Sequence, residues 1–346
     1  MRRRDHVKAD GRRLYLYGAE LHDLAALPEE PDDGVTETHL RRHPLRDEWV
    51  VYAPGRAGRE TAVPAGECVL CPSQPGGFVG EIPFTGFGVA VFENRYASFR
   101  REAGPGPDLS VTTAPARGVC EVVVYSSRHH GTLADLSPAE RELLVAVWSE
   151  RFTELYREPG VELVYPFENR GPGIGGSLTH PHGQIYALPY VPLVIGQEVA
   201  AFRDEAVLEK LLGALEERFV VAADDHHVAF VPPFARYAFE TWIVPRRFVP
   251  GPWAYRPEEA RSFAWILGDV VRRLDSLVED GILPFMMILH ASPRGEEDRF
   301  HFHVEFYPPH RPEQRVRPHV GVEFGLWVHL LEYDLDESAA RLRAAR

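Results

Sequence analysis

The chain has 346 residues, of which 45% are hydrophobic, enough for one large folded domain or two of ordinary size. Its formal net charge of −13 at pH 7 argues against a general nucleic-acid binder, because such proteins normally carry a basic surface. No run of 18 apolar residues occurs and no apolar stretch follows the N-terminal arginines, so neither a membrane span nor a secretory signal is expected.

Short strands and a few well-marked helices are expected along the chain. Asp10-Gly11 predicts a hairpin turn, and residues 28–33 form an acidic, proline-bearing linker. Strands are expected within 41–56 and over 88–92, 119–125 and 161–167. Ser137-Pro138-Ala139-Glu140 has the serine cap, proline and glutamate that begin a helix, and Pro159-Gly160 ends it. Residues 197–218 are also expected to be helical.

Only three cysteines occur, which excludes a disulfide scaffold and favours a cytoplasmic, reducing location. Two of them, in Cys68-Val69-Leu70-Cys71, have the spacing of a metal clip or a redox pair. A structural zinc ion takes four nitrogen or sulfur ligands, and His129 or its neighbour His130, together with His180, are candidates for the other two. The alternative is that both thiols are inert loop residues.

The stretch Thr179-His180-Pro181-His182-Gly183-Gln184-Ile185-Tyr186 places two histidines and a glutamine at alternate positions. On an extended strand these three side chains would face one site. An unprotonated imidazole is a nucleophile near neutral pH, and an amide can donate a hydrogen bond to charge developing on an attacked phosphorus. The alternative is a polar strand edge with chance histidines. If His180 binds a metal, the ion would hold this strand rigid beside His182 rather than act as a Lewis acid.

The loop before this stretch, Gly171 to Gly176, matches the pattern G-x-G-x-x-G. A dinucleotide site would need a helix to open directly after it, and Pro181 and Pro189 prevent a helix of useful length there. The loop is better suited to bring backbone amides close to a phosphate. Arg56 and Arg59 end an earlier turn and are either an anion clamp or a solvated basic loop.

Landmarks of the first half recur in the second half. Phe239–Val244 repeats Cys120–Tyr125 after 119 residues, and His301–Glu305 repeats His180–Gln184 after 121. We infer an internal duplication in which strand, helix, strand and motif strand are used twice. In the second copy Glu305 stands where the first has glutamine, and its negative charge suits a cation better than a phosphoryl anion.

A second possible metal set comes from the duplicated half. It consists of Glu198, His290, His303 and Glu305, with His301 nearby. These residues converge only if the duplication brings both halves together; otherwise they are surface acids and histidines.

With these motifs the chain resembles the galactose-1-phosphate uridylyltransferase family of the histidine-triad superfamily. The resemblance spans nearly the whole chain after residue 35 and rests on Cys68–Cys71, Phe92-Glu93-Asn94, Phe167-Glu168-Asn169, His180–Gln184 and Phe306-Tyr307-Pro308-Pro309. It implies an α+β fold of two fused histidine-triad-like halves, mostly antiparallel sheet with flanking helices, usually as a homodimer. We therefore expect an N-terminal extension over 1–35, a first half over 36–195 with the motif and zinc site, and a degenerate second half over 196–346.

The resemblance also implies an activity, the transfer of a uridylyl group between UDP-glucose and galactose 1-phosphate in the Leloir pathway. His182 matches the nucleophile that becomes uridylylated, and Gln184 the residue that contacts the phosphoryl group. The structural zinc ligands are matched by Cys68, Cys71, His129 and His180. The ligands of a second, iron or zinc, site are matched by Glu198, His290 and His303, with Glu305 where some members have a third histidine.

The family's nucleotide- and sugar-phosphate-binding positions are spread over both halves. They are matched by Arg56, Arg59, Asn94, Phe167, Asn169, Gly175, Gly176, Ser177, Gln184, Glu323 and His329, the last standing where a sugar-contacting glutamine is common. Two other functions are compatible with the fold. One is a nucleotidyltransferase or phosphorylase acting on ADP-sugars or dinucleoside polyphosphates. The other is a non-catalytic nucleotide-binding or metal-sensing protein, against which the intact His182 and Gln184 argue.

Overall fold

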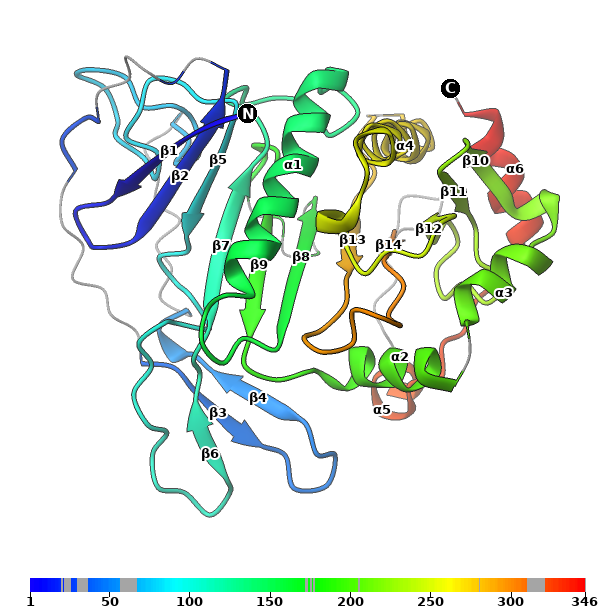
Figure 1. The fold of residues 1–346 in the computed structure, drawn as a ribbon, viewed down its shortest axis with the longest axis horizontal. Helices are drawn as coiled ribbons and strands as arrows, with labels where there is room; N and C mark the ends of the chain where they lie inside the picture. Colours follow the sequence, from blue (N-terminus) through cyan, green and yellow to red (C-terminus); the bar gives the residue numbers. More distant parts are fainter. Residues whose placement is uncertain are drawn as a thin grey trace.

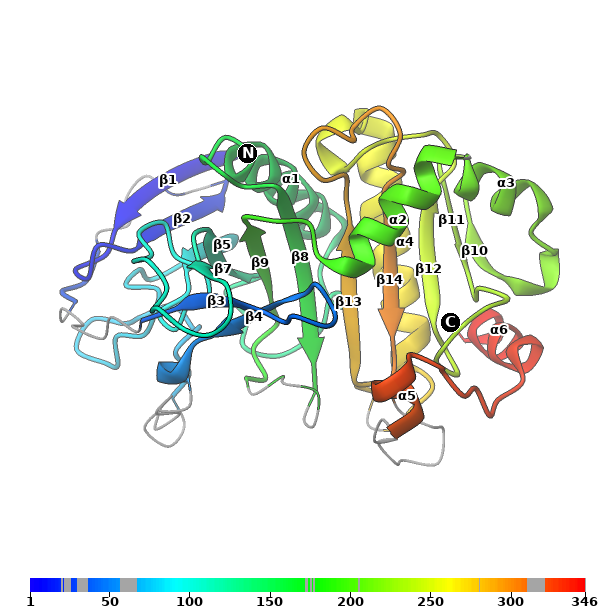
Figure 2. The ribbon, with the colours of Figure 1, turned by 90° about the horizontal axis from the view of Figure 1, so that it is seen from below.

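The computed structural model describes residues 1–19, 21, 26–29, 37–56, 67–171, 174, 176, 178–204, 206–279, 281–309 and 321–345. Within this part of the chain, eleven strands form one antiparallel sheet in the order β1-β2-β5-β7-β9-β8-β13-β14-β12-β11-β10 (Figure 1). A small sheet of order β4-β3-β6 lies beside it (Figure 2). No helix of the described residues is long and apolar enough to cross a membrane.

The large sheet takes strands from both halves of the chain. The N-terminal extension supplies β1 (Arg2–Val7) and β2 (Arg13–Gly18), and the first half supplies β5 (Val89–Glu93), β7 (Val119–Val124), β8 (Leu163–Arg170) and β9 (His182–Leu188). The second half supplies β10 (Val220–Ala223), β11 (His227–Phe230), β12 (Thr241–Pro245), β13 (Phe285–His290) and β14 (His303–Tyr307). The small sheet consists of β3 (His39–Arg42), β4 (Trp49–Tyr52) and β6 (Thr113–Pro115).

Helices pack against the sheet and connect its strands. They are α1 (Pro138–Leu155), α2 (Leu193–Asp204), α3 (Val207–Ala214), α4 (Pro257–Asp275), α5 (Gly321–Leu326) and α6 (Leu335–Ala344). Short 3₁₀ turns occur at Pro54–Arg56, Glu217–Phe219 and Pro252–Ala254. The main apolar core joins α1 and α4 to one face of the sheet, and both helices lie over that face in Figure 1.

Several predicted elements are confirmed. Gly11, with φ of 84°, turns β1 into β2, and Val7 pairs with Arg13 across the hairpin. The start of α1 is a full capping box, because Ser137 Oγ accepts a 3.3 Å bond from the Glu140 amide and the Glu140 carboxylate accepts a 2.8 Å bond from the Ser137 amide.

The single helix predicted over residues 197–218 is wrong. Two helices occupy this region: α2 begins earlier, directly after Pro192, and α3 ends at Ala214. They are separated because Ala206 leaves helical geometry, with φ of −74° and ψ of 70°. The start of α2 was missed because a proline before an apolar run is as typical of a loop as of a helix start.

The central six strands have a mirrored order, β7-β9-β8 followed by β13-β14-β12. Each trio holds the three strands expected of the duplicated unit, with its motif strand in the middle. The two trios meet where β8 pairs with β13, Phe167 lying opposite Ile288. Motif strands β9 and β14 are therefore separated by two strands of one continuous sheet.

Candidate functional site

The motif strand β9 lies between β7 and β8 and divides its side chains between the two faces of the sheet. Ile185 and Ala187 enter the core under α1, whereas His182 and Gln184 are half-buried and face the other way. Gln184 pairs with Phe167 of β8. His182 and Gln184 therefore share one face, as the alternation predicted.

Hydrogen bonding and burial determine the tautomer and the protonation state of His182. Its Nδ1 is 2.8 Å from the backbone carbonyl of His180, which can only accept, so Nδ1 carries the proton and Nε2 keeps its lone pair. Burial lowers the pKa of His182, although the carbonyl bond opposes this shift. The ring is consequently neutral at pH 7, the form that attacks an electrophile.

His180 does not face the same site as His182 and Gln184. It precedes β9, is 1% exposed, and its Nε2 donates to the carbonyl of Ser126 at 2.8 Å. The other ring nitrogen, Nδ1, lies 3.5 Å from the sulfur of Cys71. The alternation that places the other two side chains stops at His182 because the strand begins there.

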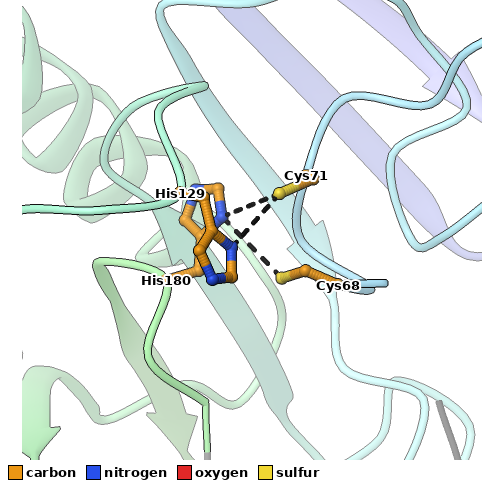
Figure 3. Close-up of side chains that lie close together, drawn as sticks. All are labelled: Cys68, Cys71, His129 and His180. Atoms are coloured by element: carbon orange, nitrogen blue, oxygen red, sulfur yellow. Dashed lines mark hydrogen bonds between the residues drawn. The ribbon is translucent and has the colours of Figure 1, made fainter. Parts of the chain in front are cut away.

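The cysteine pair and two histidines form a compact cluster (Figure 3). The ligand atoms of Cys68, Cys71, His129 and His180 all lie within 4.8 Å of one another. His130 lies outside this group and packs its ring edge-on against His129. Two sulfurs and two imidazole nitrogens are the donor set that a structural zinc ion takes.

Two pKa shifts in this cluster describe the metal-free protein. Burial, with Cys68 adding to it, raises the pKa of the Cys71 thiol to about 11. Burial lowers the pKa of His180 to about 4, so its imidazole is neutral, as a metal ligand must be. A bound cation would deprotonate the thiols and so stabilise these four residues together.

A second cluster lies on β13, β14 and α2. The ligand atoms of Glu198, His290, His303 and Glu305 also lie within 4.8 Å of one another, so the two halves do bring these distant residues together. His290 Nδ1 is 3.0 Å from a Glu198 oxygen, while His290 Nε2 is buried and has no hydrogen-bond partner among the described residues. Such an orphaned nitrogen, 3.7 Å from a Glu305 oxygen, fits a metal ion.

His301 takes no part in the second cluster. It is 0% exposed, and its Nδ1 lies 3.4 Å from Glu209 of α3.

The residues matched to substrate-binding positions fall into separate places. A cavity of about 570 Å³ at the start of β9 is lined by His182, Asn169 and Gly176, among others. Glu323 and His329 instead line a second cavity, of about 460 Å³.

Arg56 and Asn94 meet elsewhere, at the backbone of Tyr96. Arg56 donates to the Tyr96 carbonyl at 2.5 Å, and Asn94 accepts from its amide at 2.8 Å. Arg59, Gly175 and Ser177 lie outside the described residues.

The sequence reasoning missed Glu168 as a functional neighbour of His182. Glu168 is 5% exposed and lines the same cavity as His182. Burial raises its pKa to about 7, although nearby Arg170 and a hydrogen bond from Tyr125 oppose the shift. In the sequence, Glu168 is marked by its place inside Phe167-Glu168-Asn169, a stretch that supports the resemblance but does not indicate a role for the glutamate.

Sequence relatives of this chain carry the name galactose-1-phosphate uridylyltransferase. Residues 28–192 match the family model described as galactose-1-phosphate uridyl transferase, N-terminal domain. The galactose-1-phosphate uridylyltransferase of Thermotoga maritima is 37% identical, over 88% of this chain and 97% of the relative. The chain belongs to the galactose-1-phosphate uridylyltransferase family. The Streptomyces lividans relative of that name is 32% identical over 97% of this chain and 95% of its own.

Solved structures agree with membership in the galactose-1-phosphate uridylyltransferase family. A uridylyltransferase structure superposes with a TM-score of 0.80 at 28% identity, covering 89% of this chain and 98% of that one. An ADP-glucose phosphorylase from Arabidopsis thaliana has a TM-score of 0.66 at 20% identity over 90% and 98% of the two chains, which shows a shared fold alone. The expected family, the α+β fold and the enzyme class are confirmed.

Proposed function

We propose that this chain moves the uridylyl group of UDP-glucose to galactose 1-phosphate through a covalent intermediate on His182. The observation that carries this proposal is the neutral, half-buried His182 ring, whose Nδ1 donates a hydrogen bond to a backbone carbonyl. That bond orients the ring and leaves Nε2 as the attacking atom. The names of the relatives support the choice of nucleotide and sugar.

The reaction consists of two displacements at the α-phosphorus. His182 Nε2 forms a P–N bond as the P–O bond to glucose 1-phosphate breaks, and glucose 1-phosphate leaves as a stable anion that needs little help from an acid. A phosphate oxygen of galactose 1-phosphate then attacks, and the P–N bond breaks. Gln184, on the same face as His182, donates a hydrogen bond to the charge that develops on the phosphoryl oxygens.

We further propose that Cys68, Cys71, His129 and His180 hold a structural zinc ion. The ion would fix the His180 ring, and the carbonyl of the same residue orients His182. Its contribution would be rigidity of the strand start, because all four ligands come from the protein and no position is left for substrate. Glu198, His290, His303 and Glu305 would hold a second ion, iron or zinc.

We also propose the substrate contacts, the assembly, the location and the domain division of the chain. Substrate contacts are assigned to Arg56, Arg59, Asn94, Phe167, Asn169, Gly175, Gly176, Ser177, Gln184, Glu323 and His329. A homodimer, a cytoplasmic location and a division of the chain after residue 195 are proposed from the resemblance and from the low cysteine count.

The test is to trap the intermediate. Protein incubated with UDP-glucose labelled at the α-phosphorus, without acceptor, should carry one label on His182, found by peptide mass spectrometry after alkaline quenching. Adding galactose 1-phosphate should discharge it, and the steady-state kinetics should be of the double-displacement type. His182→Gln is the matched control and should take up no label. Turnover without a labelled His182 would overturn the mechanism, and turnover only with ADP-glucose plus phosphate would favour the phosphorylase alternative.

A further inference from the structure

Glu305 has a charged neighbour that does not belong to the second cluster. One carboxylate oxygen of Glu305, Oε1, lies 3.3 Å from His303 Nε2. The other, Oε2, accepts a hydrogen bond of 3.1 Å from the guanidinium Nη2 of Arg236. Arg236 comes from the loop between β11 and β12, so it approaches the cluster from outside the strands that carry the histidines. Oε2 also lies 3.7 Å from His290 Nε2, beyond hydrogen-bond distance, so Arg236 is the nearer of these two neighbours.

Arg236 is itself held in place. The same Nη2 donates to Glu240 at 3.1 Å, the backbone amide of Arg236 donates to Glu240 at 2.6 Å, and the guanidinium lies 4.5 Å from the ring centre of Tyr307. Glu240 is 0% exposed. Since both partners of Arg236 are buried carboxylates, its orientation is fixed before any ligand arrives.

The same frame continues to the histidines. Trp242 donates its indole N–H to Glu240 at 3.0 Å, and its ring stacks on His303 with ring centres 5.2 Å apart. Arg236, Glu240 and Trp242 therefore form a continuous support behind two of the four ligand positions. Ligands are commonly oriented by such a surrounding layer of hydrogen bonds.

Charge gives this support a second role. The four ligand side chains include two carboxyl groups, one more than a set with histidine at position 305. Arg236 supplies a positive charge at hydrogen-bond distance from Glu305. A buried carboxylate is costly unless it is paired, so the arginine offsets the charge that the glutamate adds.

We propose that Arg236 is a positioning residue of the second metal site and that Arg236 and Glu305 work as a pair. Arg236 occupies Oε2 of Glu305, which leaves Oε1, the oxygen beside His303, to face the cation as a single ligand atom. The proposal rests on the proposed second metal site and does not depend on uridylyl transfer.

The experiment counts bound metal in the full-length protein. Wild-type protein stripped with a chelator and reloaded with Zn²⁺ should bind two equivalents, the tighter one at the cysteine cluster. Arg236→Ala should keep the first equivalent and weaken the second about 10- to 100-fold, the usual loss when a residue that orients a ligand is removed. Arg101→Ala is the matched control, because Arg101 bonds Glu93 at 2.8 Å in the first half, away from this cluster.

The pairing is tested by a double substitution. Glu305→His alone places the positive guanidinium of Arg236 beside a ligand without negative charge. The guanidinium and the metal cation then repel each other with no carboxylate between them, so binding of the second equivalent should weaken about tenfold. Glu305→His with Arg236→Ala should regain most of the loss. Should Arg236→Ala not fold, Arg236→Lys keeps the charge without the planar guanidinium and should show a smaller loss.

Three results would overturn the proposal. They are an Arg236→Ala protein that binds both equivalents as tightly as wild type, a double variant that is as weak as the two single losses combined, and a wild-type protein that binds only one equivalent. The last would remove the second site and leave the uridylyl-transfer proposal standing, because labelling of His182 is measured separately.

Discussion

In the proposed mechanism, Gln184 is the side chain beside His182 that stabilises the attacked phosphoryl group. It lies on the same face of β9, two residues along, and its amide can donate to the phosphoryl oxygens while the P–N bond forms. We expect Gln184→Ala to lower kcat on the order of 10²-fold, as loss of one transition-state donor does. Gln184→Glu keeps the shape but cannot donate, so it should be at least as slow. A Glu variant close to wild type in steady-state assays would contradict the role as a donor.

Glu168 makes stability depend on pH in a defined direction. Burial raises the pKa of Glu168 to about 7, above the value expected in the unfolded chain. Below about pH 4.5 both states are protonated and folding loses nothing, whereas above about pH 7 the folded protein must bear a buried charge. Stability from this residue is therefore present in acid and lost as the pH rises through about 7.

The matching substitution is Glu168→Gln, which cannot ionise. Relative to wild type it should be stabilising at pH 8, by about 3 kcal/mol at most, and close to neutral at about pH 4, measured by urea unfolding. Comparing the two proteins at each pH removes the contribution of other titrating groups. A difference that is the same at both values would show that Glu168 does not titrate between them.

Gly183 of β9 lies directly against the hydroxyl of Tyr125, where only a residue without a Cβ fits. A Cβ added at Gly183 would overlap the Tyr125 hydroxyl and come within 3.0 Å of the Phe167 carbonyl oxygen. Gly183→Ala should therefore displace the neighbouring His182 and Gln184 and lower kcat on the order of 10²-fold, the cost of a shift of about 1 Å. Tyr125→Phe removes the overlapping oxygen, so adding it to Gly183→Ala should restore part of the rate. No restoration would place the clash elsewhere.

Local sequence signals predicted where some elements begin and turn, but they did not predict how every side chain is directed. The hairpin at Gly11 and the start of α1 were predicted because turn and cap chemistry act within a few residues. The break at Ala206 was missed because no glycine or proline marks it. His180 was assigned to the wrong direction because the strand period was extended past the start of β9.

The two candidate metal clusters differ in how directly the sequence predicts them. The cysteine spacing indicated the first directly, and the structure brings His129 rather than His130 to it. The second was reachable only through the internal repeat, since its members are separated by about 90 residues before they meet on one face. Arg236 could not have been predicted, because its partner Glu305 lies on β14, far away in the sequence, and the two meet only when the loop that carries Arg236 packs against that strand.

Across the whole sheet, one row of paired residues connects the two motif strands. Gln184 pairs with Phe167, Phe167 with Ile288, and Ile288 with Glu305. Opposite residues of antiparallel strands point to the same side, so the glutamine of one repeat and the glutamate of the other share a face. The repeat alone could not predict this, because it depends on the register between β8 and β13.

The junction between the two halves carries a buried ion pair. Arg170, at the end of β8, pairs with Asp275 at the end of α4 and donates to the Leu283 carbonyl at 2.7 Å. Its guanidinium also lies 3.9 Å from the ring centre of Phe285 on β13. Asp275 is 8% exposed and accepts a further bond of 3.1 Å from the Leu283 amide. One arginine from the first half therefore holds three points of the second.

Removal of Arg170 should leave the buried carboxylate of Asp275 without an ionic partner. Arg170→Met keeps the apolar contact with Phe285 but leaves Asp275 unpaired, which should cost about 3–5 kcal/mol of unfolding free energy in urea denaturation at pH 7. Asp275→Asn added to Arg170→Met removes the stranded charge and should recover much of the loss, because a neutral amide at this place needs only hydrogen bonds. Asp275→Asn alone supplies the second single loss. A double variant whose loss equals the sum of the Arg170→Met and Asp275→Asn losses would mean that the two side chains are not coupled, and that β8–β13 pairing and the packing of α1 against α4 join the halves without them.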